Sequence, residues 1–183
     1  MLGNFKILFT VLVLCMSSAF LSCDDAVDLS NKPVVDKKFE KEQLENANKY
    51  MIAQEKEAIN DFIARNGIEM VETGTGLRYR IVKQGDTIPI KTGDIVVMEY
   101  EMRFLTGEMI YSSEQNGPKV FKVGRGGVES GMEEAVLHLH RGDEAEIIIP
   151  SHLAYGLVGD GENIPPRAAL LYKVKIIDNQ TNK

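Results

Sequence analysis

Two short motifs in the C-terminal part of the chain hold the residues best suited to chemistry. The run Ala154-Tyr155-Gly156 is followed eight residues later by Ile164-Pro165-Pro166. Together they predict a small apolar pocket rimmed by the phenol hydroxyl of Tyr155. Such a pocket suits a neutral ligand that contains proline, because binding there needs little beyond apolar contact and one hydrogen bond.

Other motifs fail on their context. Gly124-Arg125-Gly126-Gly127 is not a dinucleotide-binding loop, because the third glycine of that motif comes only at Gly131 and no parallel βαβ unit surrounds it. His138 and His140 stand two apart on a predicted helix and therefore point in different directions, which disfavours a shared metal ion. Asp160-Gly161-Glu162-Asn163 lacks the distal carboxylate of a calcium loop and is better explained as a turn. We expect neither a metal nor a cofactor.

Rotation about an X-Pro amide is a reaction that needs no nucleophile and no metal. Its barrier of roughly 18–20 kcal/mol arises from amide resonance. Twisting the bond makes the carbonyl less dipolar, so a dry, preorganised pocket shaped for the proline ring favours the twisted state over the planar one. A hydroxyl or a backbone N–H that holds a neighbouring carbonyl would fix the orientation of the substrate.

Composition and charge set the broad class. The 183 residues are 44% apolar and 26% charged, typical of one globular domain with short appendages. The net charge of −6 and the pI near 5.2 make nucleic acid a poor partner.

The amino-terminal segment has the features of an export leader. Residues 1–22 combine Lys6, an apolar stretch from Ile7 to Met16 and small residues, which predicts a signal peptide too short for a membrane span. Cys23 follows Leu21-Ser22, where a lipoprotein signal peptidase would expose it for lipidation. We expect a lipid-anchored protein of the cell envelope that faces the periplasm, with the choice of membrane open. A simple secretory signal is the alternative.

Beyond the leader the sequence divides into further regions. Residues 23–35 are acidic and aperiodic, which predicts a flexible tether. Residues 36–66 carry a helical stripe that includes Leu44, Met51 and Ala58, and predict a long spacer helix whose stripe leaves a homodimer open. Residues 67–183 would form the globular domain.

The globular part alternates strand patterns with turn residues and includes one short amphipathic helix. The helix would start at Ser130, with Glu133 completing a capping box, and would end at Gly142. These patterns predict an α+β domain in which an antiparallel sheet folds over that helix. The strand candidates are Ile68 to Glu72, Leu77 to Lys83, Asp94 to Phe104, Lys119 to Val123, Glu144 to Ile149 and Leu170 to Ile177.

The segment from Gly76 to Asp178 resembles the FKBP-type peptidyl-prolyl cis-trans isomerase family in the order and spacing of many motifs. The matching motifs are Thr92-Gly93-Asp94, Val96-Val97-Met98-Glu99-Tyr100, Thr106-Gly107-Glu108 leading to Ser112-Ser113, Val123-Gly124, Gly131-Met132-Glu133-Glu134, Arg141-Gly142-Asp143, Leu153-Ala154-Tyr155-Gly156 and Ile164-Pro165-Pro166.

The resemblance implies a half-wrapped antiparallel sheet with a proline pocket between the sheet and the short helix. In the family, the hydroxyl matching Tyr155 and the backbone N–H at the position of Glu129 hold substrate carbonyls. Ile110 and Tyr111 replace a Phe-Asp pair, and Met132 and Lys119 stand where tryptophan and another aromatic residue are common. By resemblance the pocket would be lined by Tyr100, Phe121, Val128, Met132, Tyr155, Ile164 and Tyr172, with Ile110 and Tyr111 also binding substrate. The resemblance implies a catalytic role for Tyr155, Tyr100 and Glu129.

Three functions are compatible with this pattern. The first is a peptidyl-prolyl isomerase that assists folding of exported proteins in the envelope, in a layout similar to the gliding-motility-associated isomerases of Bacteroidetes. The second is a non-catalytic chaperone or binding module of an envelope complex, and the third is a purely structural lipoprotein. Phe121, Val128 and Met132 could equally be core residues, and a tyrosine such as Tyr155 is by itself more often a packing residue.

Overall fold

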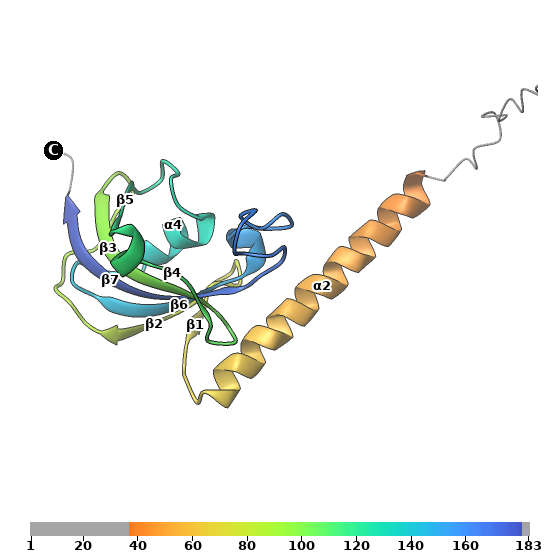
Figure 1. Ribbon diagram of the computed structural model, residues 1–183, viewed down its shortest axis with the longest axis horizontal. Coiled ribbons are helices and arrows are strands. Elements are labelled where there is room, and N and C mark those ends of the chain that lie inside the picture. Colours follow the sequence, from red (N-terminus) through yellow and green to blue (C-terminus); the bar gives the residue numbers. More distant parts are fainter. Residues whose placement is uncertain (1–36, 181–183) are drawn as a thin grey trace, which may run out of the picture. The chain divides into compact units, whose positions relative to one another are not determined.

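The helix predicted over residues 36–66 is present as α2 (Lys37–Arg65) in the computed structural model, which describes residues 37–180 (Figure 1). Just after it, the Asn66 side chain donates a hydrogen bond to the Phe62 carbonyl at 2.8 Å. Gly67 has a φ of +60°, which glycine adopts without steric cost, so the chain can leave the helix here. The predicted signal peptide (1–22), Cys23 and the tether (23–35) lie outside the described residues.

Every strand pair of the domain is antiparallel, which confirms the predicted α+β class. The long strand β3 pairs with β7 along one edge and with β4 and β5 along the other. The remaining order runs β1-β2-β6-β7. The strands are β1 (Val71–Glu72), β2 (Arg78–Lys83), β3 (Ile95–Phe104), β4 (Met109–Ser112), β5 (Lys119–Lys122), β6 (Glu144–Ile149) and β7 (Leu170–Gln180).

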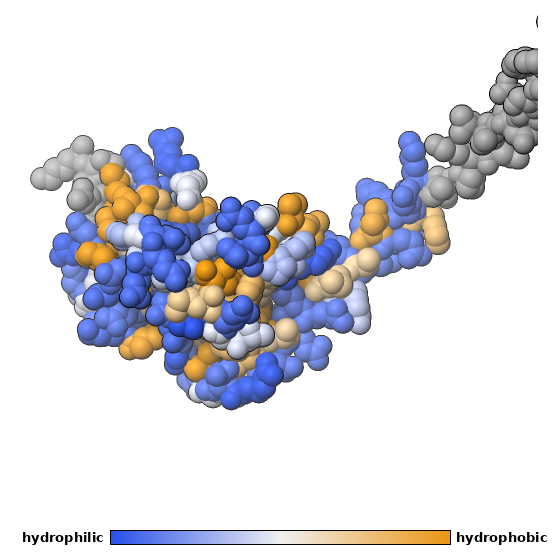
Figure 2. Space-filling view, viewed as in Figure 1, coloured by the Kyte–Doolittle hydropathy of each residue, from blue (hydrophilic) through white to orange (hydrophobic). Residues whose placement is uncertain are grey.

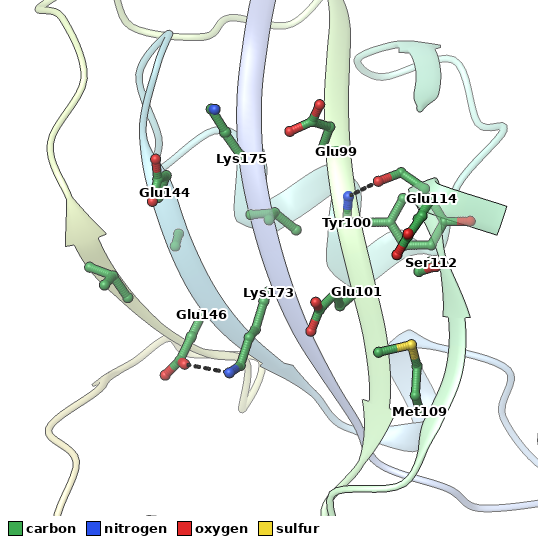
Figure 3. A pocket seen from close by; sticks show the side chains of 14 residues that line it. Glu99, Tyr100, Glu101, Met109, Ser112, Glu114, Glu144, Glu146, Lys173 and Lys175 are labelled. Atoms are coloured by element: carbon green, nitrogen blue, oxygen red, sulfur yellow. Dashed lines mark hydrogen bonds and ion pairs between the residues drawn. The ribbon is translucent and has the colours of Figure 1, made fainter. Parts of the chain in front are cut away.

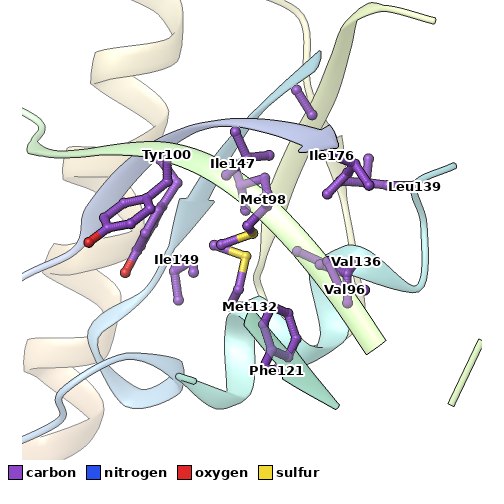
Figure 4. Packing of buried hydrophobic residues seen from close by; sticks show 14 of the residues in the cluster. Val96, Met98, Tyr100, Phe121, Met132, Val136, Leu139, Ile147, Ile149 and Ile176 are labelled. Carbon is purple, nitrogen blue, oxygen red and sulfur yellow. The ribbon is translucent and has the colours of Figure 1, made fainter. Parts of the chain in front are cut away.

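The sheet curves around the short helix α4 (Ser130–Val136), and the main core lies between them (Figures 1 and 4). Alternate residues of β3 face the helix and are buried, as the period of two for a strand requires. Met132 and Val136 of the helix pack into this core. Tyr100, Phe121 and Tyr172, which were predicted to line the pocket, belong to the same cluster.

The start of α4 differs from the predicted capping box. Glu129, not Ser130, precedes the first turn, and its side chain makes no capping hydrogen bond. The Ser130 hydroxyl instead donates to the Leu153 carbonyl at 3.1 Å. Glu133 accepts hydrogen bonds from the backbone N–H groups of Gly124 and Gly126, so it ties the preceding loop to the helix.

The sequence pattern did not predict the shortest elements. It also predicted a longer helix than α4. The strand β4, the one-turn helix α3 (Ser113–Asn116) and the 3-10 turn η2 (Ser151–Leu153) were not predicted. After Val136 the chain tightens into turns, with the N–H of Leu137 donating to the Glu134 carbonyl at 3.2 Å. Elements of a few residues carry too little periodicity to be recognised.

A second apolar cluster lies on the other face of the sheet and includes the last turns of α2. Ile59 of the helix is buried with Ile148 of β6 and Leu171 of β7. The Glu55 carboxylate accepts hydrogen bonds from the backbone N–H and the hydroxyl of Ser151, at 2.5 and 2.8 Å. Residues from Gln43 onward belong to one compact unit, so this part of the helix is integral to the domain.

The surface is mostly hydrophilic, with apolar side chains in small groups (Figure 2). Leu157 and Val158, just beyond Tyr155, are among the exposed apolar residues. Within residues 37–180, no helix is both long and apolar enough to cross a membrane.

Candidate functional site

Tyr155 lies on a tight segment that follows η2. The N–H groups of Ala154 and Gly156 both donate to the Ser151 carbonyl, at 3.0 and 2.8 Å. Gly156 has a φ of +63°, and its carbonyl accepts the N–H of Arg167 at 2.8 Å. These backbone bonds fold the segment back on itself and hold the half-buried Tyr155 ring against the core cluster.

Three residues of the predicted site line one recess of the domain, and the others lie in or against the core cluster. A recess of about 310 Å³ is lined by Lys119, Gly127, Val128, Glu129, Ala154 and Tyr155. The side chains predicted to line the pocket fall into two groups by depth. Tyr100, Phe121, Met132, Ile164 and Tyr172 are buried in the core cluster, whereas Ile110, Tyr111, Val128 and Tyr155 are partly buried against it.

The recess differs from the expected apolar pocket because it holds a carboxylate. Glu129 Oε1 accepts hydrogen bonds from the hydroxyls of Tyr155 and Tyr172, at 2.6 and 2.7 Å. Lys119 Nζ lies 3.4 Å from the same oxygen, and the Glu129 side chain is only 5% exposed. The family resemblance assigns a role only to the backbone N–H of Glu129. The signal it missed is an ionisable side chain at a position that borders the pocket.

The surroundings of Glu129 keep its carboxyl ionised. Burial by itself raises the pKa of this carboxyl, but the Lys119 ammonium, the hydroxyls of Tyr155 and Tyr172 and the backbone N–H of Glu129 together bring the pKa below its usual range. Burial and the hydrogen bond to this carboxylate raise the pKa of Tyr155, and burial with the nearby charge raises that of Tyr172. Both phenols therefore stay protonated and act as donors.

Lys119 extends over the aromatic side of the recess. Its Nζ lies 5.2 Å from the ring centroid of Tyr100 and 5.7 Å from that of Tyr172, within the range of cation–π attraction. The two rings are tilted, with their centroids 6.3 Å apart. The ammonium thus occupies the place of the aromatic residue that the family resemblance led us to expect, and it supplies a positive charge beside the carboxylate.

Tyr111 connects strand β4 to the loop that follows Tyr155. Its hydroxyl donates to Asp160 at 2.7 Å and accepts from the Asn163 side chain at 3.0 Å. Asp160 also accepts the N–H of Ile164 at 2.7 Å. Burial opposes ionisation of Asp160, but the Tyr111 hydroxyl and the backbone donors lower the pKa of this carboxyl to about 2. Tyr111 therefore fixes the loop that carries Ile164.

A second hollow, of about 540 Å³, lies over the solvent-facing side of β3, β6 and β7 (Figure 3). Glutamates and lysines alternate across neighbouring strands there, and Glu146 pairs with Lys173 at 3.8 Å. This arrangement is typical of a solvated sheet face. Among residues 37–180, no group of three or more His, Cys, Asp and Glu side chains is placed to hold a metal ion.

Comparison with known proteins identifies the family. The family described as FKBP-type peptidyl-prolyl cis-trans isomerase matches residues 86–177. A Neisseria meningitidis protein named probable FKBP-type peptidyl-prolyl cis-trans isomerase FkpA is 40% identical over 115 residues, which are 62% of this chain and 41% of that protein. The match thus spans less than half of the Neisseria relative.

Other relatives agree. Human peptidyl-prolyl cis-trans isomerase FKBP2 is 34% identical over 60% of this chain and 84% of its own length. An FKBP-type 22 kDa isomerase of Escherichia coli is 32% identical over 70% of this chain and 61% of that protein. The crystal structure of AtFKBP13 superposes with a TM-score of 0.58 at 26% identity, covering 60% of this chain and 98% of that one. With half of its length matched by the family, the chain belongs to the FKBP-type peptidyl-prolyl cis-trans isomerases.

Proposed function

We propose that the protein is a peptidyl-prolyl cis-trans isomerase that acts on X-Pro bonds of polypeptides. The observation that carries this proposal is the hydroxyl of Tyr155, held in a recess that adjoins the buried side chains of Met132 and Phe121. Family membership supports the same activity.

The proposed mechanism uses differential binding without covalent chemistry. The proline ring would pack against Val128 and Ala154 in the recess, and the water that it displaces there would favour the less dipolar twisted amide. The Tyr155 hydroxyl and the Glu129 backbone N–H would hold the carbonyls next to the proline. Each ~1.4 kcal/mol by which the twisted state is bound more tightly than the planar state gives a tenfold acceleration.

Catalysis is tested by measuring cis-trans exchange of a Leu-Pro tetrapeptide by NMR with the full chain in mild detergent. We expect acceleration over the uncatalysed rate. Tyr155→Phe should lower kcat/KM about tenfold, because one oriented hydrogen bond of ~1.4 kcal/mol is lost. Tyr50→Phe, at an exposed tyrosine of α2, is the matched control and should leave the rate unchanged. Equal rates with and without protein would reject the activity.

A non-catalytic binding module is the second candidate, and one feature favours it. The Tyr155 hydroxyl, which an isomerase needs for its substrate, already donates its hydrogen bond to the Glu129 carboxylate. A proline peptide that binds the recess in NMR titrations without any change in its exchange rate would support this candidate over the enzyme.

We also propose that the protein works in the cell envelope, anchored through a lipid on Cys23 and facing the periplasm. The leader and Cys23 support this location. Cys23→Ser should move the protein from the membrane fraction to the soluble fraction. Retention of the variant on membranes would contradict the anchor.

Exported proteins with slow X-Pro bonds would be the substrates, and those of a gliding-motility machine are the finer proposal. This finer role rests on the succession of leader, long helix and isomerase-like domain. Loss of the gene in a gliding host should slow colony spreading, and the wild-type gene should restore it. Unchanged spreading would contradict the role.

We further propose a homodimer through helix α2, which exposes Leu44 and Met51. Light scattering of the full chain should give twice the monomer mass, and Leu44→Glu should halve it. A monomeric wild-type protein would contradict the dimer.

A further inference from the structure

The side-chain donor that the proposed isomerase offers to its substrate is already occupied by a group of the protein itself. The Tyr155 hydroxyl donates to Glu129 Oε1 at 2.6 Å. The Tyr172 hydroxyl donates to the same oxygen at 2.7 Å. A peptide carbonyl and the carboxylate compete for the single proton of the Tyr155 hydroxyl, so both cannot accept it in this arrangement.

The carboxylate is held as a bound ligand would be held. It is nearly buried, it accepts two phenol hydroxyls, and it lies 3.4 Å from the Lys119 ammonium. Hydrogen bonds to an ionised acceptor are roughly twice as strong as those between neutral groups. A neutral carbonyl is therefore a weaker partner for Tyr155 than the carboxylate that it has to replace.

The backbone allows the exchange without unfolding. Glu129 stands just before α4 and does not cap the helix with its side chain, so moving the carboxylate breaks no bond of the helix. The recess borders Gly127 and Val128 and is open to solvent. A rotation of the Glu129 side chain can thus carry the carboxylate into water.

We propose that the Glu129 side chain is an internal ligand of the proline recess, which substrate displaces and which sets the affinity of the site. The inference rests on the proposed isomerase function. It assigns to this residue a role in ground-state competition that is separate from the role of its backbone N–H. Polypeptides would bind weakly, and only those with enough contacts outside the recess would displace the carboxylate.

The first test removes the charge and keeps the shape. Glu129→Gln should bind a Leu-Pro tetrapeptide about tenfold more tightly in NMR titrations, equivalent to ~1.4 kcal/mol, because the amide is a weaker competitor for the phenols. Glu129→Ala should bind at least as tightly. Glu162→Gln removes the same charge from an exposed position on the neighbouring loop and should leave the affinity unchanged. Equal affinity of wild type and Glu129→Gln would overturn the proposal.

The second test uses the unaltered protein and so does not depend on the folding of a variant. The pKa of the Glu129 carboxyl, followed by carbon NMR, should rise toward its usual value when the peptide saturates the recess, because the displaced carboxylate enters water. A pKa that stays lowered with the peptide bound would overturn the proposal.

The two proposals fail in different ways. If wild type and Glu129→Gln bind and isomerise the peptide equally, the isomerase stands and the internal ligand is wrong. If no form of the protein binds or isomerises a proline peptide, the isomerase is wrong and the internal ligand falls with it.

Discussion

The bond between helix α2 and the segment that carries Tyr155 gives a sharp test of how the domain is held together. Glu55 accepts hydrogen bonds from the backbone N–H and the hydroxyl of Ser151, a residue that is only 6% exposed. Ser151 opens η2, which leads directly into Tyr155. Glu55→Ala leaves both donors of Ser151 without their acceptor.

The expected cost follows from the type of bond. Hydrogen bonds to charged groups contribute about 1.5–3 kcal/mol each, and a buried donor left unpaired adds its own penalty. Glu55 is partly exposed, so water replaces part of the loss. We therefore expect Glu55→Ala to lower the free energy of unfolding by about 2–3 kcal/mol in total. With a urea m-value of about 1–3 kcal/mol/M, the unfolding midpoint should fall by about 0.7–3 M.

The assay is urea unfolding of the full chain followed by circular dichroism. Glu57→Ala, at an exposed position on the same helix, carries the same change in helix propensity and should change the free energy of unfolding by less than about 0.5 kcal/mol. Equal midpoints for Glu55→Ala and Glu57→Ala would refute the argument, because the loss would then come from the helix and not from Ser151.

Further predictions concern the recess and its supports. Gly131→Ala should destabilise the domain by about 1–3 kcal/mol in urea unfolding, since the added Cβ would lie 2.4 Å from Ile149 Cγ2; a neutral effect would show that the helix shifts freely. Tyr111→Phe should raise the pKa of Asp160 above about 2, as followed by carbon NMR, because a donor is lost. The lowered pKa of Glu129 in the folded state implies stability that is present above the usual value of 4.5 and is lost as pH falls below it. Glu129→Gln should therefore lose less stability than wild type between about pH 6 and pH 3, and an unchanged loss would contradict this.

The elements that sequence patterns predicted well are those with long, regular periodicity. The long helix and the strands β3 and β7 begin and end within a few residues of the positions that the sequence predicts. Alternation along β3 is clear because every second residue is buried against α4. The sequence therefore predicts which face of the sheet covers the core.

The hydrogen-bond partners of the side chains at the site could not be predicted, because they come from residues distant in the chain. Glu129 meets Tyr155 and Tyr172, which lie 26 and 43 positions further on. Ser130 and Glu133 have the spacing of a capping box, yet their side chains bond to Leu153 and to the glycine loop. Local spacing specifies which bonds a helix start can make, and tertiary neighbours decide which bonds it does make.

A family resemblance predicts a backbone donor more safely than it predicts the contacts of a side chain. The N–H of Glu129 follows from the path of the chain into α4 and is present with any residue except proline. The side chain at that position projects into the recess, and its length and charge determine whether it meets the phenols. A buried ion pair contributes little to stability relative to apolar packing of the same volume. The pair of Lys119 and Glu129 is therefore better explained by its effect on what binds the recess than by its contribution to the fold.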